Sequence, residues 1–452
     1  MNRLLMLAAE RAIAYVNGVR DRRVYPDAGA IAALAQFDRP MPDNPTDPEE
    51  VLKLLDDIGS PATVAMTGGR YFGFVNGATL PATLAANWLA GTWDQNSALR
   101  VMSPVSATLE TVTLGWLVDV LGLPGGTGGG FVSGATMANF SGLAAARHAL
   151  LSRAGWDVEA QGLFGAPEIK VVVGDEVHVS LLKALGMVGF GRERVIRVPV
   201  DDQGRMRADQ LPPLDAMTIV CLQAGNVNTG AFDPATEICA TAHKAGAWAH
   251  VDGAFGLWAL VAPGRAPLAA GVPDADSWAT DAHKWLNVPY DSGLVFCRVP
   301  QHLRAAMSFS AAYLIEGEQR EPMHYTPDMS RRGRGIEIWA ALQSLGRSGL
   351  AEMIERTCRH ATRFAEGLRD AGYDVLNQVD INQVLVSFGD AETTQQVIAG
   401  IQTDGTCWCG GTVWRGHTAM RISVSSWATT DEDVEHSLEA MIRVAQGVRV
   451  AG

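Results

Sequence analysis

The chain has 452 residues, of which 47% are hydrophobic and 19% are charged, a balance typical of a globular enzyme and not of a disordered chain. This length predicts a large domain with one or two smaller parts. The formal net charge of −13 argues against a nucleic-acid partner, because binding to phosphates requires a basic stripe. The densest basic cluster, Arg331, Arg332 and Arg334, is short.

The cysteines and the first residues indicate the compartment. The six cysteines are scattered, except for Cys407 and Cys409, which is typical of a cytosolic protein and not of a disulfide framework. Cys407, Cys409 and His417 have poor spacing for zinc, so we expect no metal site. The start, MNRLLMLAAERAIAYV, has a short apolar run that Glu10 and Arg11 interrupt. It predicts an amphipathic helix and neither a signal peptide nor a membrane span, so we expect a cytoplasmic protein without a membrane partner.

Residues 1–98 contain helical patterns, a proline-rich connection and an aromatic segment. Pro48, followed by Glu49 and Glu50, suits the first turn of a helix. Residues 1–60 have too little apolar surface to fold alone. Residues 70–98 mix aromatic with small residues, which either pack in a core or partly line a pocket; the residues considered for a pocket are Tyr71, Phe72, Phe74, Trp93 and Asn96.

A phosphate site is indicated after residue 125. The glycines of Gly125–Gly130 predict a loop, and Ser133, Gly134, Ala135 and Thr136 precede a clear helical pattern. Small residues let backbone N–H groups approach an anion, and a helix N-terminus contributes positive potential. The segment has neither a Walker lysine nor a spaced GxGxxG, so an ordinary nucleotide loop is not supported. A plain strand–turn–helix that requires small residues is the alternative.

From residue 169 the chain alternates apolar runs with helical spacers, which predicts a mostly parallel sheet covered on both faces. The predicted strands of this sheet are 169–174, 194–199, 217–223, 247–252, 276–281 and 292–298. Strands at 383–388 and 419–424 predict a small C-terminal α/β domain. A capping box, Thr430 to Asp433, predicts the start of the final helix.

Two polar positions interrupt this apolar pattern. Asp252 ends one predicted strand, and a carboxylate there points into the ligand crevice of an open α/β sheet. Lys284 lies between His283 and Trp285 in an apolar neighbourhood. A buried lysine tends to lose its charge or to form a covalent bond, and its neutral amine is a nucleophile for carbonyls, although a surface His-Lys is the other reading of the dipeptide. Pyridoxal 5′-phosphate (PLP) requires such an Asp and Lys pair.

With these segments the sequence resembles the group II PLP-dependent decarboxylases, which include the aromatic amino acid and glutamate decarboxylases. The matching segments run in family order from Tyr71 to Thr430 and read YFGFVNG, SPVSATLE, SGATMANFSGLAAAR, GDEVHVS, HVDGAFG, DAHKWLNVPYDSG, SRRGRGIEIWAAL and RISVSSWATT. The resemblance implies the α/β architecture of the aspartate-aminotransferase fold (fold type I), with a mostly parallel seven-stranded sheet. We expect an N-terminal helical segment (1–60) that packs across a homodimer, a large PLP-binding domain (61–332) and a smaller α/β domain (333–452).

The resemblance also implies roles for individual residues. Lys284 forms the Schiff base, Asp252 keeps the pyridine nitrogen protonated, and His178 stacks on the ring. Asn226, Asn228 and Thr229 are expected beside or behind the cofactor. The full cofactor-binding set is Ser133, Gly134, Ala135, Thr136, His178, Asn228, Asp252, Ala254, Asp281, His283 and Lys284.

One substrate contact is carried over in the same way, and three others come from the aromatic segment 70–98. Arg421 matches an arginine that binds the substrate carboxylate, and Phe74, Trp93 and Asn96 are the other candidates. Residues 308–332 have no clear periodicity, as expected of a mobile lid. In the family a tyrosine of this loop protonates the intermediate. The spacing departs from the aromatic enzymes here, and their Asp-Tyr pair is absent; Tyr325 is the candidate, with Tyr313 in reserve.

The expected function is decarboxylation of an L-amino acid through Lys284, with release of carbon dioxide and an amine. A PLP-dependent aldehyde synthase or carbon–carbon lyase is the alternative, because the same residues serve both. A non-catalytic interaction protein on this fold is a further reading, which the presence of Asp252, His178 and Lys284 opposes. Pocket aromatics permit an aromatic substrate, whereas Arg70, Arg100 and Asn96 leave acidic or diamino substrates open.

Overall fold

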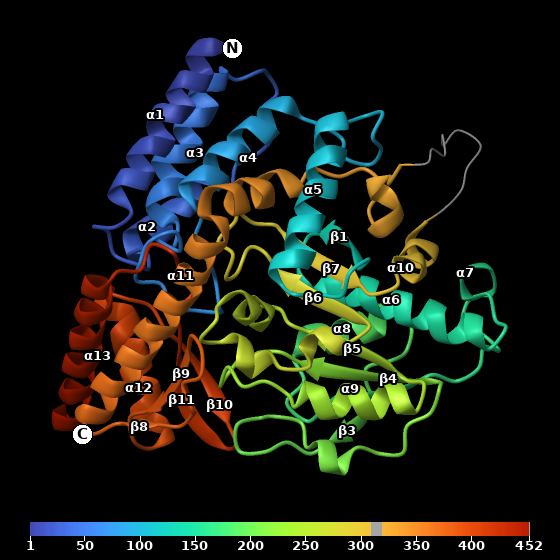
Figure 1. Ribbon diagram of the computed structural model, residues 1–452. Helices are drawn as coiled ribbons and strands as arrows, with labels where there is room; N and C mark the ends of the chain where they lie inside the picture. The colour runs from blue at the N-terminus through green and yellow to red at the C-terminus, as the bar shows by residue number, and fades with distance from the viewer. Residues whose placement is uncertain (309–318, 452) are drawn as a thin grey trace. The chain divides into compact units, whose positions relative to one another are not determined.

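The computed structural model describes residues 1–308 and 319–451 (Figure 1). The chain divides into two compact units. Unit 1 comprises Met1–Asn76, Thr362–Leu376 and Val384–Gly452, and unit 2 comprises Gly77–Ala361 and Asn377–Gln383. This division differs from the expected segments 1–60, 61–332 and 333–452, because the N-terminal residues are counted with most of the C-terminal ones.

Unit 2 contains a seven-stranded sheet in the order β1-β7-β6-β5-β4-β2-β3. The strands from β3 through β2, β4 and β5 to β6 pair in parallel, and β7 pairs antiparallel with β6 and β1. Every residue of β5, β6 and β7 is buried, so both faces are covered. The mostly parallel sheet of fold type I and its six predicted strands are confirmed. The strands are β1 Gly128–Val132, β2 Lys170–Gly174, β3 Ile196–Val198, β4 Thr218–Gln223, β5 Trp248–Asp252, β6 Ser277–Asp281 and β7 Gly293–Cys297.

Helices pack along this sheet (Figure 1). The alanine-rich helix α6 lies against β5, β6 and β7, and its small side chains allow a close approach. The α-helices of unit 2 are α4 Pro81–Trp93, α5 Pro104–Val120, α6 Ala135–Arg153, α7 Val158–Gln161, α8 Val179–Met187, α9 Ala235–Lys244 and α10 Pro300–Met307. Short 3₁₀ turns are η2 Ala208–Gln210, η3 Gly256–Val261, η4 Ala266–Ala269, η5 Val272–Asp274 and η6 Pro322–Tyr325. Helix α11, Gly335–Asp370, is interrupted at Gly346, whose φ of 60° favours glycine.

Part of the expected glycine-rich loop is a strand, so the prediction of a loop over Gly125–Gly130 was wrong for Gly128, Gly129 and Gly130. These residues belong to β1, and neighbouring atoms leave no room for side chains on them. A Cβ atom at Gly129 would lie 2.4 Å from the carbonyl oxygen of Val295, and one at Gly130 would lie 2.1 Å from that of Tyr325. Glycine is therefore needed here for close packing and not for a turn.

Unit 1 is built on helices and a smaller, four-stranded sheet in the order β10-β11-β9-β8. The predicted strands 383–388 and 419–424 are confirmed as β9 and β11, whereas β8 and β10 were not predicted. Its strands are β8 Asp374–Val375, β9 Gln383–Ser387, β10 Gly410–Trp414 and β11 His417–Ser423; its helices are α1 Asn2–Gly18, α2 Ala28–Ala33, η1 Leu34–Phe37, α3 Pro48–Ala62, α12 Ala391–Asp404 and α13 Asp431–Ala451.

The N-terminal residues belong to unit 1 because they pair with its C-terminal part. The N–H of Val24 donates to the carbonyl of Gly405 at 2.9 Å, and the N–H of Phe72 donates to that of Trp408 at 2.9 Å. The ring of Tyr71 stacks on Trp408 with centroids 5.1 Å apart. These contacts join Val24, Tyr71 and Phe72 to the C-terminal part, whereas the N-terminal helices still expose large apolar side chains such as Leu5 and Leu55.

Helix starts in unit 1 follow the predicted signals. Pro48 opens α3, with Glu49 and Glu50 in its first turn. The capping box before α13 is confirmed, since the N–H of Asp433 donates to Thr430 Oγ1 and the N–H of Thr430 donates to Asp433 Oδ2. Among the described residues, no helix combines the length and apolarity that crossing a membrane requires.

Candidate active site

Asp252 ends β5 at the carboxyl edge of the sheet in unit 2, and only 4% of its surface is exposed. Burial raises the pKa of this carboxyl, whereas the charges of His178 and Lys284 and a hydrogen bond from Asn139 lower it. The carboxylate also accepts the N–H of Ala254 at 3.2 Å. His178 and Lys284 thus lie within electrostatic reach of Asp252.

Asp281 joins the lysine to helix α6. It ends β6 beside β5, and its buried carboxylate lies 3.0 Å from Lys284 Nζ and 3.4 Å from His283 Nε2. Its Oδ1 atom also accepts the N–H of Ala135 at 2.5 Å. The predicted residues Asp281, His283, Lys284 and Ala135 therefore meet at one point, at the start of α6.

His283 is held from two further sides. The N–H of Ser292 donates to Nδ1 at 3.0 Å, so the proton of the neutral imidazole lies on Nε2, toward Asp281. Tyr290 stacks on the ring with centroids 4.3 Å apart. Burial lowers the pKa of His283, which favours the neutral ring.

The start of α6 has the features of a phosphate site. Gly134 precedes the helix and supplies no side-chain cap, and the first N–H groups of a helix have no partner within it. A Cβ atom on Gly134 would lie 3.1 Å from His283 Cε1, so a larger residue would press against the imidazole. Thr136 is half-buried in the first turn and adds a hydroxyl. These donors, beside a lysine and above a buried carboxylate, fit PLP with its phosphate, aldehyde and ring nitrogen.

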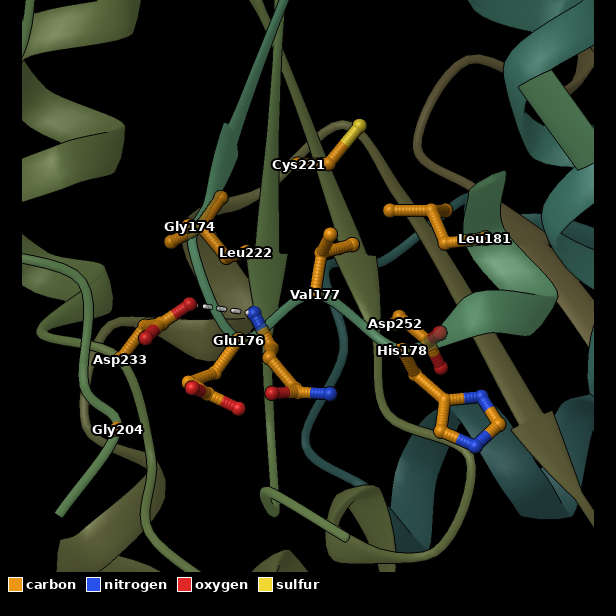
Figure 2. A pocket seen from close by; sticks show the side chains of 11 residues that line it. Gly174, Glu176, Val177, His178, Leu181, Gly204, Cys221, Leu222, Asp233 and Asp252 are labelled. Atoms are coloured by element: carbon orange, nitrogen blue, oxygen red, sulfur yellow. Dashed lines mark hydrogen bonds between the residues drawn. The ribbon is translucent and has the colours of Figure 1, made fainter. Parts of the chain in front are cut away.

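A small pocket lies at the carboxyl ends of β2, β4 and β5, and Figure 2 shows His178 and Asp252 on one side of it and Glu176 and Asp233 on the other. Asp233 accepts the N–H groups of Met206 and Gln223, each at 2.7 Å. Burial raises the pKa of Asp233 to about 6. The pocket is lined by Gly174, Glu176, Val177, His178, Leu181, Gly204, Cys221, Leu222, Gln223, Asp233 and Asp252.

The remaining predicted cofactor residues lie in loops of unit 2. His178 caps α8, and its Nδ1 atom accepts the N–H of Ser180 at 3.3 Å. Ala254 connects two strand ends, since its carbonyl also accepts the N–H of Asp281 at 2.9 Å. Asn228 is buried in a turn in which its N–H and that of Thr229 donate to Asn226 Oδ1.

Sequence reasoning missed two buried polar residues next to this site. His250 hydrogen-bonds to Asn139 at 2.9 Å and to Ser277 at 2.8 Å. A signal for His250 was available, because it lies two residues before Asp252 and therefore faces the same side of β5. Ser277 begins β6 and carries no such signal.

The predicted substrate residues fall in different units. Phe74 and Arg421 belong to unit 1, and Trp93 and Asn96 belong to unit 2. Phe74 is 61% exposed, has a φ of 54°, and stacks on Trp408. Arg421 lies on β11, where burial lowers its pKa. Trp93 ends α4, and Asn96 donates to Ser330 Oγ and accepts the N–H of Ala98.

The expected lid is only partly described. Tyr313 lies outside the described residues. Tyr325 ends η6, its ring lies under the guanidinium of Arg320 at 3.9 Å, and it packs against the hydrophobic core of unit 2. Nearby, Met323 and Arg331 are held by backbone hydrogen bonds to Ala98 and Ser97. No contact of Tyr325 with Lys284 is seen, so its role remains a prediction.

The basic cluster is neutralised by neighbouring carboxylates. Arg331 forms a bidentate, buried pair with Glu110, at 2.6 and 3.0 Å. Arg334 pairs with Asp291, and Arg332 pairs with Asp291 and Glu337. Within the described part of the chain, no group of three or more His, Cys, Asp or Glu side chains has the arrangement of a metal site.

The comparisons with known proteins agree with this geometry. The family model described as "Pyridoxal-dependent decarboxylase conserved domain" matches residues 33–389. The chain is 25% identical over 379 residues to an aromatic-L-amino-acid decarboxylase of Bacillus atrophaeus, which covers 81% of this chain and 76% of that protein. It is 26% identical over 429 residues to tryptophan decarboxylase 1 of Oryza sativa subsp. japonica, covering 86% and 82%.

Solved structures share the fold. The Oryza sativa TDC structure with PLP and tryptamine superposes with a TM-score of 0.90 at 21% identity, over 99% of this chain and 97% of that one. Mouse CSAD superposes with a TM-score of 0.88 at 18% identity, over 98% of each chain. The chain belongs to the pyridoxal-dependent decarboxylase family and is a PLP-dependent carboxy-lyase that acts on an amino acid.

Proposed function

We propose that unit 2 binds PLP through Lys284, Asp252 and His178, and that this site removes the α-carboxyl group of an L-amino acid. The supporting observation is that the charges of Lys284 and His178 both act on the buried Asp252 carboxylate, so that an amine, an imidazole and a carboxylate converge at the carboxyl edge of one sheet. When bound, PLP supplies an aldehyde for a lysine amine and a ring that withdraws electrons.

Each residue has a distinct task in this proposal. The Lys284 amine attaches the cofactor and later releases the product. Asp252 holds a proton at the ring nitrogen, and the start of α6, Ser133 to Thr136, holds the phosphate. His178 stacks on the ring, and Asn228, Ala254, Asp281 and His283 complete the site. Tyr325 is the proposed donor of the proton that replaces the carboxyl group at Cα.

We propose an aromatic L-amino acid as substrate. Support comes from the curated relatives described above, which are named for aromatic amino acids or tryptophan. The exposed ring of Phe74, backed by Trp408, is an aromatic surface of the kind that stacks with such side chains. Arg421 is the proposed partner of the substrate carboxylate, and Trp93 and Asn96 are further candidate contacts.

The test is a screen of L-amino acids for release of carbon dioxide, with the organic product identified. Release from aromatic amino acids, with an equimolar amine, supports the proposal. Release from acidic or diamino substrates only would refute the substrate assignment. Aldehyde and peroxide as main products would favour an aldehyde synthase, the activity named for a Rhodiola rosea protein with this fold. Absence of both cofactor absorbance and turnover would favour an interaction protein.

We propose that the protein is a homodimer. Unit 2 exposes large apolar side chains along α4 and from residue 101 through α5: Trp88, Leu89, Trp93, Val101, Met102, Val105, Val112 and Trp116. Large apolar side chains exposed along these segments favour an interface, and a second copy is the expected cover. Sedimentation should give twice the chain mass of 48.2 kDa, whereas a stable PLP-bound monomer would contradict the proposal.

We also place the protein in the cytoplasm. All six cysteines are free and buried, as expected of a chain that folds in a reducing compartment. Cell fractionation with an antibody tests this placement.

A further inference from the structure

A chain of hydrogen bonds leads from Asp252 into the core of unit 2. Asn139 Nδ2 lies 3.0 Å from Asp252 Oδ2, and Asn139 Oδ1 lies 2.9 Å from His250 Nε2. The other ring nitrogen, Nδ1, lies 2.8 Å from Ser277 Oγ, which also accepts the indole N–H of Trp248 at 2.9 Å. All five residues are buried, so these bonds are shielded from water.

With Asp252 ionised, only one placement of protons satisfies every member of this chain. An ionised carboxylate only accepts, so the Asn139 amide nitrogen faces Asp252 and its oxygen accepts from His250 Nε2. The Nδ1 atom of His250 then lacks a proton and accepts from the Ser277 hydroxyl. Every donor therefore points toward Asp252. Burial lowers the pKa of His250 to about 3, so the ring stays neutral, with one donor and one acceptor.

Helix α6 fixes the imidazole in this orientation. Asn139 and Gly142 are three residues apart on α6 and thus share one face of the helix. A Cβ atom at Gly142 would lie 2.7 Å from His250 Cε1 and 3.0 Å from its Nδ1. The ring is therefore packed directly against the helix.

We propose that Asn139, His250, Ser277 and Trp248 form a positioning relay that keeps Asp252 ionised and correctly oriented. The relay transfers no proton; it stabilises the charged form, because a hydrogen bond to an ionised acceptor favours ionisation. Without it, burial would favour a neutral carboxyl, which cannot hold a proton at a ring nitrogen. This inference rests on the proposed role of Asp252.

The experiment uses the complete chain loaded with PLP labelled with ¹⁵N in the ring. The ¹⁵N chemical shift reports whether this nitrogen is protonated, independently of turnover. Asn139→Leu removes both amide contacts at similar volume, and Ser277→Ala removes the hydroxyl two steps further along. The matched control is Ser141→Ala on the same helix, because the buried Ser141 hydroxyl donates to the Met137 carbonyl of its own helix and is not part of the relay.

In Asn139→Leu we expect a shift toward the unprotonated nitrogen, with kcat lower by about 10- to 100-fold and KM little changed. Ser277→Ala should show the same changes to a smaller extent, and Ser141→Ala should show neither. A protonated wild-type nitrogen that stays protonated in both relay variants, with kcat retained, would overturn the relay. An unprotonated nitrogen in the wild type would instead refute the role of Asp252. If Asn139→Leu does not fold, Ser277→Ala decides.

Discussion

The amine of Lys284 lies 3.0 Å from Asp281 Oδ2, and the other oxygen of that carboxylate accepts the N–H of Ala135 at 2.5 Å. One buried carboxylate thus connects the lysine with the first turn of α6. Because an unpartnered ammonium in such a place is costly, the Asp281 carboxylate stabilises the Lys284 side chain at this position. The same contact fixes the distance between the amine and the proposed phosphate site.

Lys284→Ala should abolish covalent attachment of PLP and turnover, because no other amine occupies this position. The measurement is the visible absorbance of the holoenzyme, followed by borohydride reduction and mass spectrometry of the labelled peptide. Lys183→Ala is the control, since Lys183 is exposed on the nearby helix α8. A borohydride-reducible adduct that persists in Lys284→Ala would refute the assignment.

Asp252→Asn should leave PLP bound but lower kcat by at least ~100-fold, since the substitution removes the charge that holds the ring proton. Single-turnover kinetics with the best substrate from the screen measure this loss. Glu176→Gln, in the wall of the same pocket, is the control and should retain activity. Near-normal turnover in Asp252→Asn would mean that another group protonates the ring.

Tyr325→Phe should slow amine formation by about 100-fold while PLP binding is unchanged, because the phenol is the proposed proton donor. The aromatic ring under Arg320 is kept, so the fold should be retained. Product analysis should show a larger share of aldehyde. An unchanged rate of amine formation in this variant, with a collapse in Tyr313→Phe or His178→Ala, would assign the proton to one of those residues.

The sheet was predictable because its central strands are buried on both faces and therefore appear as apolar runs. β6 differs from its predicted range by one residue at its start, and β7 differs by one residue at each end. β1 was missed because Gly128, Gly129 and Gly130 are typical of turns when they are seen locally. The reason for these glycines is a close approach of residues such as Val295 and Tyr325, more than 150 positions away in the sequence.

In the site, too, local features were predictable and contacts between distant residues were not. Asp252 and Lys284 were recognisable because each places a polar group at an apolar segment. Their supporting contacts were not, since His250 and Asn139 are separated by 111 positions and Ser277 and His250 by 27. The sequence around Asn139, His250 and Ser277 does not specify such pairs. They arise from the order of strands in the sheet and from the packing of α6 on it.

Asp233 should make stability depend on pH. Its pKa is raised to about 6 from an ordinary value of 3.8, so its contribution to the free energy of unfolding is fully present below about pH 3.8 and is lost as the pH rises through 6. The contribution of Asp233 to the free energy of unfolding falls by about 3 kcal/mol over this pH range. Urea unfolding of the wild type and of Asp233→Asn at pH 4 and pH 7 measures it. The stability advantage of the wild type over the variant should be larger at pH 4; an advantage that is independent of pH would contradict the raised pKa.

Gly77→Ala should disturb the lysine directly. A Cβ atom at Gly77 would lie 1.8 Å from the carbonyl oxygen of Lys284, and no side-chain rotation relieves an overlap with backbone. The segment that carries the lysine must therefore move, and a displacement of about 1 Å costs roughly 100-fold in rate. We expect weaker PLP binding and a lower kcat, measured by absorbance titration and by carbon dioxide release. Gly186→Ala in α8 is the matched control, because nothing lies within 4 Å of a Cβ atom there and activity should be retained. Wild-type PLP affinity and kcat in Gly77→Ala would show that the position of Lys284 does not depend on this contact.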